Sequence, residues 1–86
     1  MKQKQLAIPV VWLGYSPACQ KALRLLRFCS INEMPKTAFT VYELEKVTGF
    51  SHQHLDRCMK KLFADKVVDF RVVNRKGRAA REWFAL

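Results

Sequence analysis

The sequence predicts an α+β domain in which three helices are followed by a β-hairpin. Apolar residues at helical spacing, bounded by capping residues, occur over residues 16–31 and twice over residues 40–66. The period changes to two over residues 67–86, where two alternating runs flank a polar stretch that contains a glycine. A chain of 86 residues buries one modest core. We therefore predict a single domain over residues 1–86, in which residues 1–15 are an N-terminal extension.

The first helix is expected within residues 16–31, "SPACQKALRLLRFCSI". Ser16 is suited to cap it, and Pro17 suits its first position, where an amide hydrogen is not needed. Apolar residues then recur at three- and four-residue spacing, which places them on one face. They are Ala18, Ala22, Leu25, Leu26 and Cys29.

Residues 40–66 predict two further helices joined by a tight turn, a helix-turn-helix. Thr40 stands three residues before Glu43, which is the spacing of a capping box. Gly49 lies where a left-handed residue ends a helix, so the first of the two helices is expected to span about residues 41–48. The apolar side of this helix consists of Val41, Leu44 and Val47.

The second helix of the pair follows the turn "GF" and begins after Ser51, a capping residue. At about 100° per residue, Gln53, Arg57 and Lys60 point away from its apolar face. Gln can pair with the edge of an adenine and Arg with that of a guanine, so the exposed face carries residue types that read bases. The apolar face consists of Leu55, Cys58, Met59 and Leu62.

Residues 67–86 predict a hairpin. Val68, Phe70 and Val72 alternate with charged residues in "VVDFRVV", and "REWFAL" alternates in the same way. The polar stretch "NRKG" between them carries Gly77, which suits a turn residue with positive φ. A helix, a helix-turn-helix and a hairpin, in this order, make a winged helix. The wing would place three cations at its tip: Arg75, Lys76 and Arg78.

The charge of the chain predicts a polyanionic partner. The formal net charge is +9 with a pI of about 10.0, and residues 51–86 carry nine cations against four acids. Nucleic acid is the first expectation and an acidic membrane surface the second. We expect the partner to be double-stranded DNA, with the lysines of the last helix and the wing cations bound to phosphates. The alternative is that these cations lie on a helix face and a turn that contact only solvent. The predicted DNA-contacting residues are Ser51, His52, Gln53, His54, Arg57, Lys60, Lys61, Arg75, Lys76 and Arg78.

The longest apolar run, "LAIPVVWLGY", has ten residues and contains Pro9, whereas a membrane-spanning helix needs about 20. We therefore expect no membrane partner and a cytoplasmic, nucleoid-associated protein. Ile8, Val10 and Trp12 alternate as in a strand. This segment either packs on its own domain or forms a homodimer contact, and the sequence does not choose between the two.

Neither a metal site nor a catalytic site is expected. The three cysteines form no CxxC motif, so they are expected to be reduced core residues; the alternative is a redox or metal role with His52 and His54. The seven acids are scattered, and no nucleophile elbow or phosphate-binding loop occurs. We therefore expect a protein that is not an enzyme and needs no cofactor.

The stretch "TVYELEKVTGFSHQHLDRCMKKLFADKVV" resembles the helix-turn-helix of bacterial winged-helix transcription regulators of the MarR and ArsR type, and "GRAAREWFAL" resembles their second wing strand. The sequence departs from them at Asp65 and Lys66, where many relatives have a glycine, and it lacks the ArsR-type metal-ligand cluster. The resemblance implies sequence-specific binding of duplex DNA, usually as a dimer. Two alternatives stay open: a winged-helix scaffold for protein interactions, or binding of RNA or unusual duplexes by shape.

Overall fold

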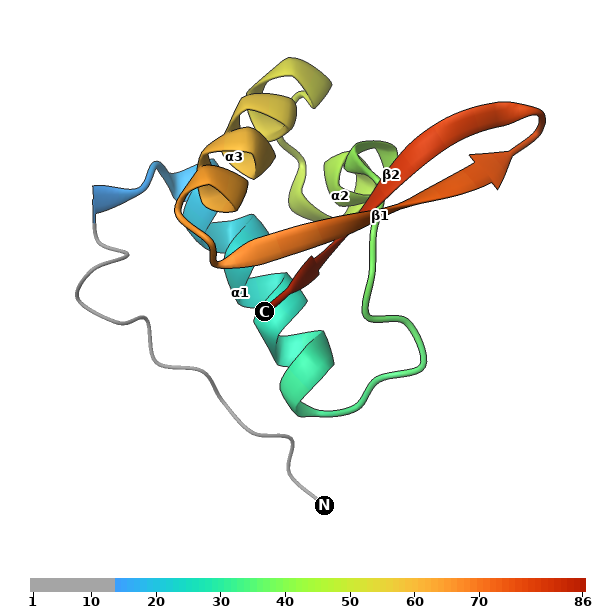
Figure 1. Cartoon of the computed structure of the whole chain (residues 1–86). Coiled ribbons are helices and arrows are strands. Elements are labelled where there is room, and N and C mark those ends of the chain that lie inside the picture. Colours follow the sequence, from blue (N-terminus) through green and yellow to red (C-terminus); the bar gives the residue numbers. More distant parts are fainter. Residues whose placement is uncertain (1–13) are drawn as a thin grey trace.

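The computed structural model describes residues 14–86. It contains three helices, α1 (Pro17–Ile31), α2 (Val41–Thr48) and α3 (His52–Ala64), followed by strands β1 (Val68–Arg75) and β2 (Arg78–Ala85) (Figure 1). The strands form an antiparallel hairpin. The α+β layout is that of a winged helix, as the sequence predicts.

The helices begin and end where local hydrogen bonds satisfy their free backbone groups. The Ser16 hydroxyl accepts from the Cys19 amide at 3.3 Å at the start of α1. Thr40 and Glu43 form the predicted capping box of α2, and Gly49, at φ 80°, ends it in the left-handed conformation. The predicted caps of α1 and α2 are therefore confirmed.

The turn after α3 is made without glycine. Lys66 takes the left-handed conformation with φ 62°. Its amide donates to the Phe63 carbonyl at 3.0 Å, and the Val67 amide donates to the Leu62 carbonyl at 3.1 Å. This pair of hydrogen bonds is a Schellman motif, in which glycine is the usual left-handed residue. Lys66 thus performs the turn for which many winged-helix proteins use glycine.

The tip of the hairpin is a two-residue turn. Arg75 pairs with Arg78 across the strands, and the intervening Lys76 and Gly77 have φ values of 52° and 78°. Positive φ at both central residues is the mark of a type I′ turn, whose twist matches that of the two strands. The predicted positive φ of Gly77 is therefore confirmed, and the tip holds its cations on a short, regular turn.

The hairpin is attached to the helices through Trp83, which is 2% exposed. Its amide donates to the Phe39 carbonyl at 2.8 Å, and its carbonyl accepts from the Phe39 amide at 2.9 Å. Its ring contacts Phe63 of α3 and Phe70 of β1. The other fully buried large side chains come from α1, α2, α3 and β1: Leu23, Leu26, Leu44, Leu55, Met59, Leu62 and Val68.

Two residues expected on apolar faces are exposed. Val47 is 53% exposed, and Thr48 is buried in its place because its hydroxyl donates to the Leu44 carbonyl at 2.7 Å. Val72 is 64% exposed because the hairpin extends beyond the helices toward its tip (Figure 1). The strand-like alternation predicted for Ile8, Val10 and Trp12 lies outside the described residues.

Candidate nucleic-acid interface

The outward face of α3 is polar and basic. Gln53, Arg57 and Lys60 are exposed, whereas the four apolar residues of the opposite face are buried, so the predicted orientation of the helix is confirmed. Neither Gln53 nor Arg57 makes a hydrogen bond or ion pair through its side chain within residues 14–86. Their polar groups are therefore free to bind a ligand.

The first turn of α3 is partly occupied with structural contacts. The Ser51 hydroxyl accepts from the His54 amide at 3.3 Å and so caps the helix. The His54 ring meets Phe50 edge-on, with centroids 5.7 Å apart. The His52 ring lies 4.5 Å from the Tyr42 ring, and its Nδ1 is buried without a hydrogen-bond partner in the described part of the chain. Of these residues, His52 is the one with an unsatisfied polar group.

The two lysines of α3 are exposed, and each pairs with an acid four residues away in the sequence. The Lys60 ammonium lies 2.9 Å from Asp56, and the Lys61 ammonium lies 3.9 Å from Asp65 and over the Tyr15 ring. Exposed pairs of this kind contribute about 0–1 kcal/mol. Both lysines can therefore turn to a phosphate at little cost.

The three cations of the wing tip differ in their surroundings. Lys76 and Arg78 are exposed and make no ion pair within the described residues. The Arg75 guanidinium instead forms a short hydrogen bond to Glu82 and lies 3.6 Å from Glu43. The charge of Arg75 is thus largely balanced by two carboxylates of the protein. The tip sequence "NRKGR" does not reveal this difference from Lys76 and Arg78.

The carboxylates beside Arg75 connect the hairpin to α2. The Glu43 carboxylate accepts from the Thr40 amide at 2.9 Å and pairs with Lys36 at 2.8 Å. Burial works to raise the pKa of Glu43, but the hydrogen bonds from Lys36 and Thr40 outweigh it and lower this pKa to about 2. The hydrogen bond from Arg75 keeps the pKa of the buried Glu82 below its ordinary value, against the opposing effect of burial. Both carboxylates are therefore charged at neutral pH.

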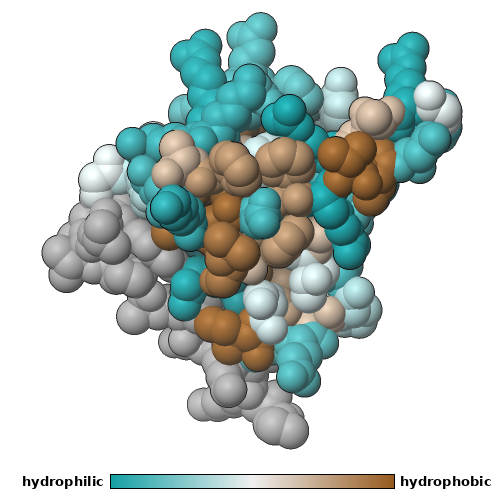
Figure 2. All heavy atoms as spheres, in the orientation of Figure 1, coloured by the Kyte–Doolittle hydropathy of each residue, from teal (hydrophilic) through white to brown (hydrophobic). Residues whose placement is uncertain are grey.

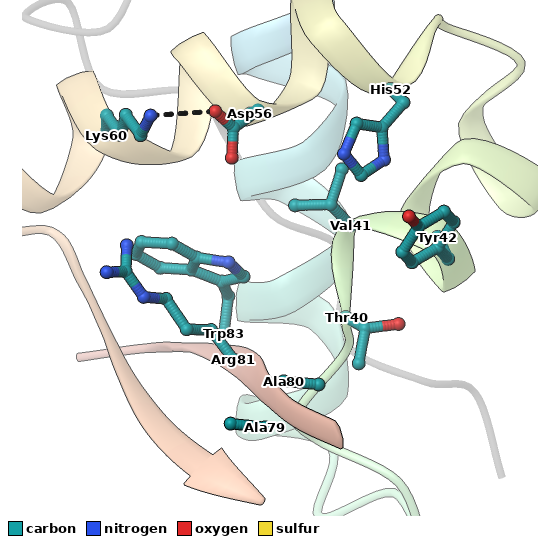
Figure 3. Close-up of a pocket in the computed structure, with 10 residues that line it drawn as sticks. All are labelled: Thr40, Val41, Tyr42, His52, Asp56, Lys60, Ala79, Ala80, Arg81 and Trp83. Atoms are coloured by element: carbon teal, nitrogen blue, oxygen red, sulfur yellow. Dashed lines mark ion pairs between the residues drawn. The ribbon is translucent and has the colours of Figure 1, made fainter. Parts of the chain in front are cut away.

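A pocket of about 260 Å³ lies between α3, the start of α2 and β2 (Figure 3). Arg81 lines it and places its guanidinium carbon 4.7 Å from the centre of the Phe70 ring. Arg81 was not among the predicted site residues because it lies outside the wing tip. It pairs across the hairpin with Val72, and the alternation of Val72 with Phe70 was the signal that Arg81 lies on the same strand face as Phe70. Ten residues line the pocket: Thr40, Val41, Tyr42, His52, Asp56, Lys60, Ala79, Ala80, Arg81 and Trp83.

The thiols lie in the core. Cys19, Cys29 and Cys58 are buried and free, and burial raises the pKa of Cys58 to about 11 and also raises that of Cys29. A thiol with a raised pKa is a poor nucleophile and metal ligand at neutral pH. Residues 14–86 contain no cluster of three or more side chains suited to hold a metal, and no helix among them is long and apolar enough to cross a membrane.

The geometry defines the fold class of this domain: a winged helix whose third helix and hairpin tip present exposed cations. We compared the chain with protein-family models, with curated proteins and with solved structures, and none of the three comparisons finds a match. The resemblance to MarR- and ArsR-type regulators therefore stays a prediction from the sequence pattern.

The carboxylate of Glu43 should make stability depend on acid pH. A pKa of about 2, against an ordinary 4.5, means that ionised Glu43 stabilises the fold above about pH 4.5 and that this stabilisation is lost as the pH falls toward 2. In Glu43→Gln, the free energy of unfolding should be lower at neutral pH and should fall less on acidification, as measured by urea denaturation across this range. Glu45→Gln, on the same helix, is the control. An acid dependence in Glu43→Gln equal to that of the parent chain would contradict this account of the capping box.

Proposed function

We propose that this winged helix is a sequence-specific binder of double-stranded DNA, a small transcription regulator that places α3 in the major groove and the hairpin beside it. The observation that carries the proposal is the shape of the polar surface. Figure 2 shows hydrophilic side chains projecting over α3 and over the hairpin tip toward one side of the molecule, the top of the view, with apolar atoms between them. The exposed cations of α3 and of the tip suit two neighbouring tracts of a duplex backbone.

Base reading falls to the residues of α3 that are exposed and unpaired. The major groove is about 12 Å wide and admits a helix. Gln53 and Arg57 are one turn apart on the outward face, so both can face base edges at once. Gln53 suits an adenine and Arg57 a guanine. The other polar residues of α3 already contact groups of the protein, and we assign them to the sugar-phosphate backbone of the DNA.

Phosphate binding falls mainly to Lys76 and Arg78, since these wing cations are exposed and unpaired in residues 14–86. Lys60 and Lys61 add to it after releasing their weak partners. Arg75 has a different role, because its ion pairs with Glu82 and Glu43 hold the wing against α2. A homodimer and a nucleoid location belong to the same proposal. Residues 6–15 either pack on their own domain or form the dimer contact, and residues 1–13 lie outside the described part of the chain.

The salt dependence of binding should separate the wing cations from one another. Each cation on a phosphate releases counterion, so Lys76→Gln and Arg78→Gln should each reduce the slope of log affinity against log salt by about 1. Arg75→Gln should reduce it less, because Glu82 and Glu43 already balance that charge. Fluorescence anisotropy with a random-sequence duplex measures all three variants, with the exposed Arg24→Gln of α1 as control. Slopes that stay at the parental value in Lys76→Gln and Arg78→Gln would show that the wing does not touch the backbone.

The recognition helix should govern sequence preference. Selection from a library of randomised duplexes should enrich a motif, and Gln53→Ala or Arg57→Ala should cost about 1–3 kcal/mol at one base position and relax preference there. Lys76→Gln should leave the motif unchanged. If the library yields no motif, or if the chain binds an RNA duplex more tightly, recognition of duplex shape would be favoured over base reading. An absence of binding to either nucleic acid would favour a protein-interaction scaffold.

A further inference from the structure

The pocket between α3 and β2 has the chemistry of an anion site. Lys60 of α3 and Arg81 of β2 bring positive charge to it from two elements. In Figure 3 the indole nitrogen of Trp83 faces the same space, and an indole nitrogen is a hydrogen-bond donor only. Ala79 and Ala80 form part of the wall with small side chains, which keeps the pocket open.

His52 adds a ring nitrogen to this pocket. Its Nδ1 is buried without a partner in the described residues, and its ring lies beside that of Tyr42. Figure 3 shows one ring nitrogen directed toward Tyr42 and the other toward the middle of the pocket. The buried nitrogen is Nδ1, so Nε2 is the one that faces the pocket and can donate a hydrogen bond to an anion.

Asp56 is the one carboxylate among the residues that line the pocket, all of which lie in the described part of the chain. It holds the Lys60 ammonium at 2.9 Å, as the dashed line in Figure 3 marks. A carboxylate and a phosphate diester both present anionic oxygens to an ammonium group. Asp56 therefore occupies, from within the protein, the position that an incoming phosphate would take beside Lys60.

We propose that this pocket seats one phosphate diester of the DNA backbone, held by Arg81, Lys60 and His52, and that Asp56 competes with this phosphate for Lys60. The inference rests on the proposed function. The pocket lies between α3 and β2. When α3 lies in one groove of the DNA and the wing beside the next, the sugar-phosphate strand between the two grooves passes over this pocket. Asp56 then weakens binding to every duplex, whatever its sequence.

Removal of the Asp56 carboxylate tests the proposal, because the expected result is a gain of affinity for DNA. A variant that merely unfolds would lose affinity instead. Asp56→Asn should bind a random-sequence duplex about threefold more tightly at low salt, since the Lys60 pair it breaks is worth up to about 1 kcal/mol. The matched control is Glu45→Gln, which removes a carboxylate of α2 that makes no ion pair within residues 14–86. An equal gain in both variants would show that the gain comes from the change in net charge alone, and would overturn the proposal.

Arg81 provides the second arm. Arg81→Gln should weaken binding and lower the salt slope by about 1, and Arg81→Lys should restore the slope. In the Arg81→Gln background, Asp56→Asn should gain no more than Glu45→Gln does, because both residues act on the same phosphate. Additive effects, or an unchanged slope in Arg81→Gln, would overturn the phosphate seat while leaving DNA binding in place. An absence of binding by the parent chain would overturn the proposed function itself.

Discussion

The packing of Trp83 determines where the wing stands. This one residue pairs through its backbone with the segment before α2 and touches α3 and β1 with its ring. Directional backbone hydrogen bonds and close ring packing fix a geometry more firmly than exposed charges do. The spacing between α3 and the hairpin, on which any two-part contact with a duplex depends, is therefore set by the core. The pocket between these elements has Trp83 as part of its wall.

Two acids of this basic chain hold elements together. Glu43 and Glu82 gather Lys36, Arg71 and Arg75 between α2 and the hairpin. Farther out, Lys76 and Arg78 have no acid beside them in the described residues, so their charge is available to a partner. A net charge of +9 thus divides into cations that stabilise the position of the wing and cations that face outward. Counting charges along the sequence does not make this division.

Features governed by residues close in sequence could be predicted. The capping box of α2, the left-handed Gly49, the orientation of α3 and the positive φ of Gly77 each depend on a few neighbouring residues. Long-range contacts could not. No pattern near Arg75 indicates that it pairs with a carboxylate 32 positions earlier, and the pocket that contains Arg81 requires the placement of α3 against β2. Lys66 shows a further limit, since a propensity argument favours glycine at a left-handed position that this chain fills with lysine.

In the proposed complex, duplex DNA lies across α3 and the wing, on the side of the molecule away from α1. Backbone amide chemical shifts of the full chain, recorded by NMR as a random-sequence duplex is added, locate the bound duplex. We expect the largest changes in two separate stretches, residues 52–61 and residues 75–81, with small changes along α1. Changes that concentrate on α1 or on the loop before α2, with α3 and the wing tip unaffected, would contradict it.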